Sequence, residues 1–87
     1  MATTNTKITT DDGWMLVATD AKCTVQVVYG ASGGYALYNR ASSAPSSTAT
    51  DGIVLSVGQS ITNSYDTPQN SYVRAMGHEI TVSVITE

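Results

Sequence analysis

The feature that most constrains this chain is the alternation of apolar and polar residues in several short segments. Residues 23–27 (Cys-Thr-Val-Gln-Val) and 80–84 (Ile-Thr-Val-Ser-Val) each place every second side chain in an apolar set. Because side chains alternate between the two faces of a strand, this pattern predicts β-strands with one buried face. No window of helical length keeps apolar residues at three- or four-residue spacing, so we expect no significant helix.

Turn residues divide the sequence into seven or eight short segments of strand type. The predicted strands cover residues 6–10, 13–19, 22–29, 35–40, 52–57, 60–63, 71–76 and 79–86. Many short strands separated by frequent turns are typical of antiparallel sandwiches and small barrels. We expect an all-β protein, a single antiparallel β-sandwich of Ig-like or jelly-roll-like type over residues 11–87. An N-terminal arm or edge strand at residues 1–10 would precede it.

The turns and strand faces can be predicted in more detail. The dipeptides that start at Gly58 and Gly77 have the glycine-first form of a type II′ turn, which predicts two tight hairpins. In the segment 22–29, the alternation places Tyr29 on the inward face. Residues 13–19 are apolar on both faces, which indicates a central or interface strand.

The size of the chain limits its core. A domain of 87 residues buries a modest core and usually needs disulfides, a metal or oligomerisation for stability. Cys23 is the single cysteine and cannot form an intramolecular disulfide, so we interpret it as a buried thiol in a reducing compartment. Homo-oligomerisation remains as the expected source of additional stability.

The charge pattern argues against several classes of partner. The net charge is −3, and the four basic residues are scattered singly along the chain. Binding to nucleic acid or to an anionic membrane needs clustered Lys and Arg, so neither is expected. The longest apolar stretch, residues 14–18, is far too short to cross a membrane, and no signal-peptide pattern is present. We expect a soluble protein made in the cytoplasm.

Catalytic and metal-binding constellations are not predicted. His78 is the single imidazole and falls in a predicted turn, so a nucleophile–histidine–carboxylate triad is not expected. One His and one Cys cannot supply the three or four ligands of a zinc site. The aspartates at 11–13 and 51–52 are better explained as turn residues than as calcium ligands. We predict a protein that is not an enzyme and has no cofactor.

The tyrosines support an alternative function. Tyr35 and Tyr38 are three apart in one predicted strand and therefore point to opposite faces, so one of them is expected to be exposed. Together with Tyr65 in a loop, an exposed tyrosine could stack on sugar rings. This hypothesis is a carbohydrate-binding module with a glycan partner. A small enzyme or inhibitor domain is a third reading, but it would need a cleft that the sequence does not indicate.

Two stretches in the C-terminal half carry short motifs. Residues 43–45 (Ser-Ala-Pro) followed by 52–58 (Gly-Ile-Val-Leu-Ser-Val-Gly) are similar to the proline loop, apolar strand and closing glycine of small bacteriophage virion proteins. Residues 72–76 (Tyr-Val-Arg-Ala-Met), then Gly77 and the alternating strand 80–84, are similar to their C-terminal hairpin. The resemblance implies a β-sandwich that decorates or cements a capsid, or attaches a tail or fibre, and it carries over no catalytic residue.

This resemblance implies a homo-oligomer that binds the major capsid protein or other virion proteins. We expect the N-terminal arm and the loops at 41–51 and 63–70 to make the contacts, with the arm adding as a strand to a neighbouring sheet edge. The predicted contact residues are Thr3, Thr4, Thr6, Lys7, Ile8, Ala44, Pro45, Tyr65 and Pro68.

Overall fold

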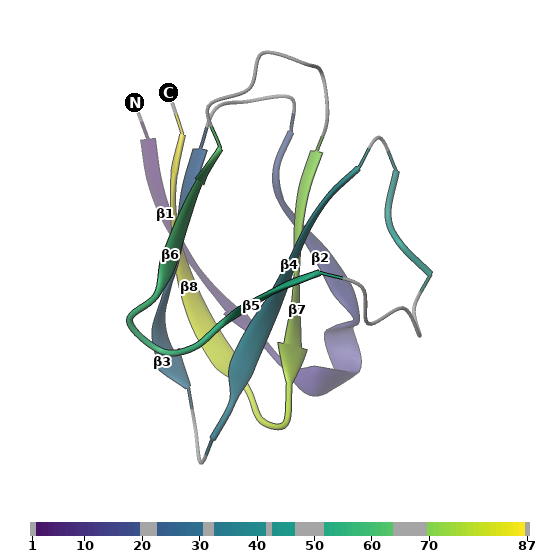
Figure 1. Ribbon diagram of the computed structural model, residues 1–87, viewed down its shortest axis with the longest axis vertical. Helices are drawn as coiled ribbons and strands as arrows, with labels where there is room; N and C mark the ends of the chain where they lie inside the picture. Colours follow the sequence, from purple (N-terminus) through teal and green to yellow (C-terminus); the bar gives the residue numbers. More distant parts are fainter. Residues whose placement is uncertain are drawn as a thin grey trace.

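Two four-stranded antiparallel sheets form the protein in the computed structural model, which describes residues 2–19, 23–30, 33–41, 43–46, 52–63 and 70–86 (Figure 1). Sheet A contains, in spatial order, β1 (Ala2–Ile8), β8 (Ile80–Thr86), β3 (Cys23–Gly30) and β6 (Ser60–Asn63). Sheet B contains β2 (Trp14–Ala18), β7 (Asn70–Met76), β4 (Tyr35–Ala41) and β5 (Ile53–Leu55). A short 3-10 turn, η1 (Thr10–Asp12), lies between β1 and β2. The predicted all-β sandwich is confirmed.

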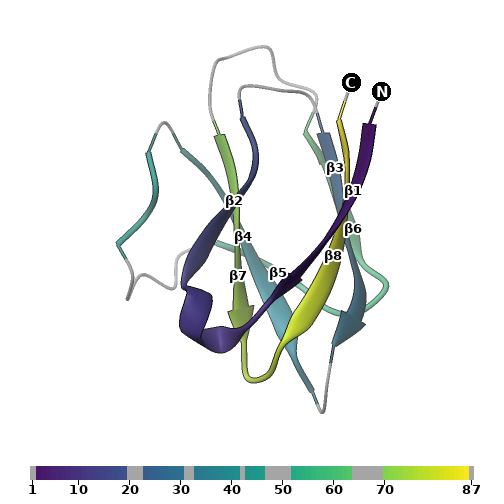
Figure 2. The ribbon, with the colours of Figure 1, turned by 180° about the vertical axis from the view of Figure 1, so that it is seen from behind.

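The order of the strands identifies the type of sandwich. Every connection except that from β4 to β5 passes from one sheet to the other. This interleaving of eight strands in two sheets is the jelly-roll arrangement, one of the two types expected from the sequence. The edges of the sandwich are therefore β1 with β2 on one side and β5 with β6 on the other. Figure 2 shows the β1–β2 side, with the two chain ends close together.

The core lies between the sheets and is built from the alternating residues of their central strands. On β8, Ile80, Val82 and Val84 are buried, and the residues between them face away from the core. Residues Cys23, Val25 and Val27 of β3, Ala36 and Tyr38 of β4, and Val73 and Ala75 of β7 complete most of this cluster. The burial of Cys23 confirms that its thiol is a core group.

A β-bulge in β3 overturns the prediction for Tyr29. Val27 pairs with Val82 and Tyr29 pairs with Thr81, so Val28 is an extra residue on β3. A bulge inserts one unpaired residue and shifts the side-chain alternation beyond it. Tyr29 therefore leaves the inward set and is 56% exposed. The alternation of residues 22–29 gave no sign of this change of face.

Both predicted type II′ hairpins are wrong. The strands on either side of Gly58 belong to different sheets, and so do those on either side of Gly77. At the first, Gln59 N donates to Ser56 O at 2.9 Å, which makes Gly58 the second central residue of the turn, with φ 90°. At the second, His78 N donates to Met76 O at 2.9 Å around Gly77, with φ 79°. Both turns reverse the chain but carry it across the sandwich.

The two N-terminal strands are both edge strands, which was one of the two alternatives expected for residues 1–10. β1 pairs with β8 of its own chain from Ala2 to Ile8, so the first residues form an edge strand and not an arm extended toward a neighbour. β2 is also an edge strand, with a register shift between Leu16 and Ala18, so the central position suggested by its two apolar faces is wrong. Between them Asp12 accepts a hydrogen bond from Thr9 N at 2.9 Å, the turn role predicted for the aspartates of this segment.

The burial of Ile8 allows a test of what β1 contributes. Ile8 is fully buried at the end of β1, so Ile8→Ala should lower the free energy of unfolding by about 2–5 kcal/mol in urea denaturation. Ile8→Val should lower it by about 0.5–1.5 kcal/mol, which keeps the test open if the alanine variant fails to fold. Thr3→Ala, on the exposed part of the same strand, should change it by less than about 0.5 kcal/mol. Equal effects at the two positions would contradict the packed edge strand.

Candidate functional site

The described residues contain no cluster of three or more His, Cys, Asp or Glu side chains that could hold a metal ion. His78 is exposed in the turn between β7 and β8, where the sequence placed it. Within the same ranges, no helix is long and apolar enough to cross a membrane.

A small polar network crosses the core between the two sheets. Tyr38 Oη on β4 and Ser71 Oγ on β7 are hydrogen-bonded at 2.8 Å, and Ser71 Oγ lies 3.5 Å from Cys23 Sγ on β3. All three side chains are buried. Buried polar groups are costly unless they are paired, and this arrangement pairs each of them. The network is a structural link between the sheets.

Burial raises the pKa of the Tyr38 phenol above its ordinary value of 10.0, while the hydrogen bond with Ser71 acts in the opposite direction. The neutral phenol is therefore the form that the folded protein favours. A neutral phenol, a hydroxyl and a buried thiol without a neighbouring imidazole do not form an activated nucleophile. The network offers no catalytic chemistry.

The outer faces of the two sheets differ in character. On sheet A the outward residues are mostly hydroxyl and amide side chains, and Thr24 Oγ1 lies 3.1 Å from Thr62 Oγ1 across β3 and β6. Lys7 Nζ and Glu79 Oε2 form an exposed ion pair at 3.1 Å, of a kind that contributes little to stability. This face is a solvated polar surface.

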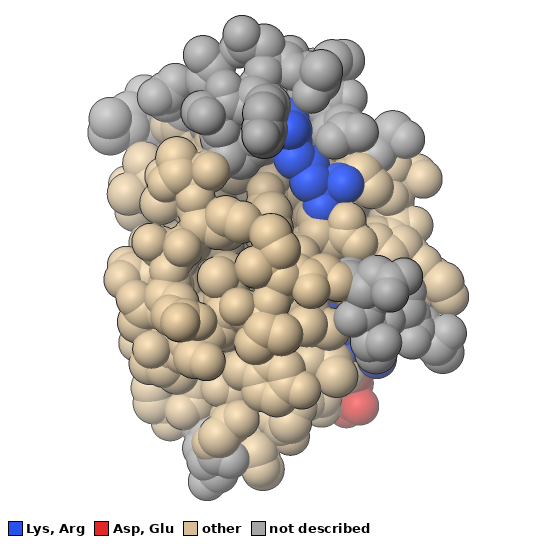
Figure 3. Space-filling view, viewed as in Figure 1, with Lys and Arg blue, Asp and Glu red and all other residues tan. Residues whose placement is uncertain are grey.

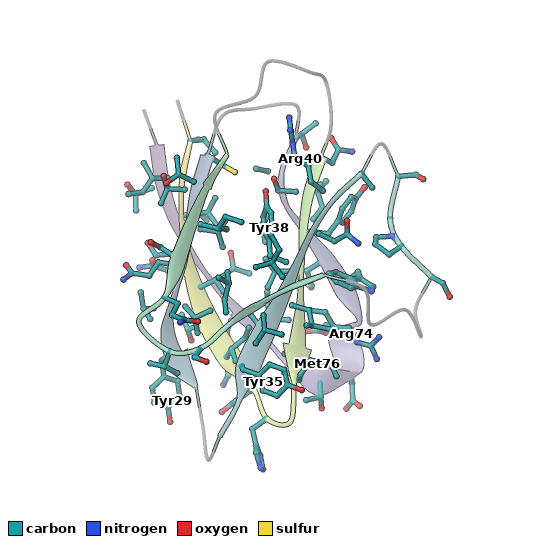
Figure 4. The ribbon with its side chains drawn as sticks, viewed as in Figure 1. Tyr29, Tyr35, Tyr38, Arg40, Arg74 and Met76 are labelled. Atoms are coloured by element: carbon teal, nitrogen blue, oxygen red, sulfur yellow. The ribbon has the colours of Figure 1, made fainter. Side chains whose placement is uncertain are left out.

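On sheet B the outer face holds a second apolar cluster. Leu37 and Tyr72 are buried, yet they are not part of the core cluster between the sheets. Trp14, on β2, lies opposite Arg74 in register, and a Cβ at Gly52 would be 3.3 Å from Trp14 Cη2. Since Gly52 precedes β5, at the other end of the sheet, the indole reaches across the face. Figure 4 shows Arg74 pointing away from the sandwich on this side.

An open groove with a mainly apolar lining lies beside β5. It has a volume of about 570 Å³ and is lined by Gly33, Gly34, Tyr35, Val54, Ser56 and Val57. Val54 is 55% exposed and Val57 is 50% exposed. The turn that carries Val57 is attached to β3, because Gly58 N donates to Val27 O at 2.7 Å. We call these lining residues the β5 groove, and it is the candidate site of the molecule.

The predicted contact residues of the N-terminal strand differ in their exposure to solvent. Thr3, Thr4 and Lys7 are exposed, and Thr6 is half-buried. Ile8 is fully buried in the core, so it is not a surface contact, and that prediction is wrong. Ile8 is buried because it lies on the inward face of β1, where it pairs with Ile80 of β8.

The predicted loop contacts and tyrosines have different outcomes. Ala44 is exposed and Pro45 is half-buried, while Tyr65 and Pro68 lie outside the described residues. Tyr35 and Tyr38 do point to opposite faces. The side chain of Tyr35 is half-buried, whereas that of Tyr38 is only 4% exposed. Tyr38 is therefore a core residue and not an exposed aromatic. Figure 4 shows Tyr38 between the sheets and Tyr35 near Met76.

The sequence did not predict the β5 groove. Residues 52–57 were expected to form one strand, whereas β5 ends at Leu55, and of Ile53, Leu55 and Val57 only Leu55 is buried. An available signal was the lack of charged residues from Gly52 to Asn63. An edge strand without charge is unusual in a monomer, because charges normally protect such edges.

Comparisons with protein-family models, with curated proteins and with solved structures found no match to this chain.

The buried phenol leads to a prediction about alkaline pH. A folded-state pKa raised above the unfolded value gives a stabilising contribution that is fully present below about pH 10 and is lost as the pH rises through the folded pKa. The unfolding free energy of the wild type should therefore fall above about pH 10 more steeply than that of Tyr38→Phe. Tyr29→Phe, at an exposed ring, should keep the wild-type slope. Parallel curves for all three proteins in urea denaturation from pH 8 to 11 would contradict the buried network.

The groove depends on close packing at Gly30. A Cβ there would lie 2.7 Å from Gly34 O and 2.9 Å from Val57 Cγ2. Gly30→Ala should lower the free energy of unfolding by about 1–3 kcal/mol, measured by thermal or chemical denaturation. Val57→Ala alone should change it by less than about 0.5 kcal/mol, because Val57 is half-exposed. The double variant should stay less stable than Val57→Ala, since the contact with the Gly34 carbonyl remains; full rescue would refute this packing.

Proposed function

We propose that this protein is a non-enzymatic structural subunit of a bacteriophage particle, most closely a capsid decoration or cement protein. The observation that carries the proposal is the uncharged apolar surface along β5, where Ile53, Val54 and Val57 are each about half exposed. Contiguous exposed apolar surface on a small domain marks a site of protein–protein contact. A domain that exposes such a surface is suited to assembly.

The fold agrees with this proposal without deciding it. Jelly rolls occur in viral capsid domains, but also in lectins and in other classes, so the fold alone does not define a function. The resemblance of residues 43–58 and 72–84 to phage virion proteins supports the more specific part of the proposal. The catalytic alternative has little support, because the buried Tyr38–Ser71–Cys23 network has no imidazole or carboxylate beside it in the part of the chain that the structure describes.

The carbohydrate-binding alternative receives less support from the described aromatics. A stacking platform needs exposed rings that face the same ligand. Tyr38 is in the core, and Tyr29 extends from sheet A whereas Tyr35 extends from the outer face of sheet B (Figure 4). The two rings are therefore carried by different sheets and not by one strand face. Apolar contact between proteins is therefore the better account of the exposed residues.

Particle composition tests the proposal. Virions from a phage genome that encodes this chain should be purified on a density gradient and analysed by quantitative mass spectrometry. We expect peptides of this protein at a fixed ratio to the major capsid or tail protein, retained after a high-salt wash because apolar contacts resist salt.

Two controls make this result decisive. A host protein of similar size should be lost in the same wash, and the soluble fraction of the lysate should be measured in parallel. Recovery of the chain only in the soluble fraction would overturn the structural role. A specific glycan-array signal in that case would favour the carbohydrate-binding alternative instead.

A further inference from the structure

The described residues of β5, β6 and the turn between them carry no charge. The segment from Gly52 to Asn63 contains β5, the turn at residues 56–59 and β6, and it has no charged residue and no proline. Figure 3 views this side and shows a continuous surface without charge over β5 and β6. Arg40 and Arg74 lie at its margins, as their labels in Figure 4 show.

Exposed apolar residues gather on the same side. Among the described residues seven large hydrophobic side chains are exposed, and five of them lie on this segment or on the adjoining end of β3. These five are Val28, Tyr29, Ile53, Val54 and Val57. A hydrogen bond from Gly58 N to Val27 O joins the end of β3 to the segment. We call these five residues and the β5 groove the β5–β6 face.

The charge distribution indicates which partner fits this face. The chain has a net charge of −3, so two copies repel each other through most of their surfaces. On the opposite side of the sandwich, β1 carries Lys7, and η1 carries Asp11 and Asp12. The described residues of the β5–β6 face are uncharged, so two such faces bring no like charges together among these residues and bury no charge of their own.

The strand order allows a symmetric contact. β5 is the last strand of sheet B, so its outer edge presents backbone N–H and C=O groups to a new strand. A two-fold axis beside Val54 would place Ile53 opposite Leu55 of the second copy in an antiparallel pair. β5 has only three residues, so the apolar side chains around it must supply most of the contact.

We propose that the β5–β6 face binds a second copy of this chain and forms a two-fold symmetric dimer through antiparallel pairing of β5 with β5 of the partner. The inference deepens the proposed function, on which it rests, by naming a partner and a surface. The molecule exposes 4777 Å² in total, and a stable interface of ordinary size would cover about 800 Å² of it.

Sedimentation velocity over a range of protein concentrations tests the dimer. The wild type should sediment as a dimer, and Val54→Lys should raise the dimer dissociation constant by at least about 100-fold, because it places an unpaired charge at the two-fold axis. Leu16→Lys is the matched control. Leu16 is 51% exposed on β2, the other edge strand of the same sheet, so this variant should remain a dimer.

Amide hydrogen exchange distinguishes strand pairing from other contacts. The amides of Ile53 to Leu55 should become protected as the wild-type concentration rises, and Val54→Lys should lose this protection while its circular dichroism spectrum stays that of a folded sandwich. A wild type that stays monomeric, or a dimer that Leu16→Lys disrupts as strongly as Val54→Lys, would overturn the proposal.

The outcome is separable from that of the proposed function. If the protein is monomeric but is still recovered in purified particles, the β5–β6 face does not bind a second copy, and the structural role is unaffected. If Val54→Lys were then lost from particles while Leu16→Lys was retained, the face would bind a different virion protein. A dimer that is absent from particles would refute the structural role alone.

Discussion

The apolar stripe on the inner face of β8 is the constraint on which the rest of this structure depends. Ile80, Val82 and Val84 are buried against sheet B, while the backbone of β8 pairs with β1 on one side and with β3 on the other. β6 joins sheet A only through β3. The burial of three β-branched side chains therefore holds every other strand of its sheet in place.

Much of this architecture follows from period-two alternation, and the exceptions have physical causes. The strands 80–86 and 23–27 show one apolar face in the sequence, and that face is the core. The topology is harder to predict from the sequence. The glycine turns at 58 and 77 indicate that the chain reverses, but they do not indicate which sheet the next strand joins. A sequence pattern indicates which face of a strand is buried, whereas the neighbouring strand with which it pairs depends on packing across the whole domain.

The candidate site was harder to predict than the core for a related reason. Val54 and Val57 have the composition of buried residues, and their exposure results from the position of β5 at the end of its sheet. Tyr38, conversely, could only be assigned to the interior once Ser71 was known to lie within hydrogen-bonding distance of its hydroxyl. Edge position and the pairing of a buried hydroxyl are properties of the assembled sandwich. Neither can be obtained from a residue and its sequence neighbours.

The bulge at Val28 has a consequence beyond its own strand. Val25 and Val27 are buried, but the one extra residue turns the end of β3 outward, so Val28 and Tyr29 both contribute apolar surface beside the turn that carries Val57. That part of the surface is set by the number of residues in β3 and not by their chemical nature. A lineage could therefore remove or restore it by deleting or inserting a single codon, with the core sequence unchanged.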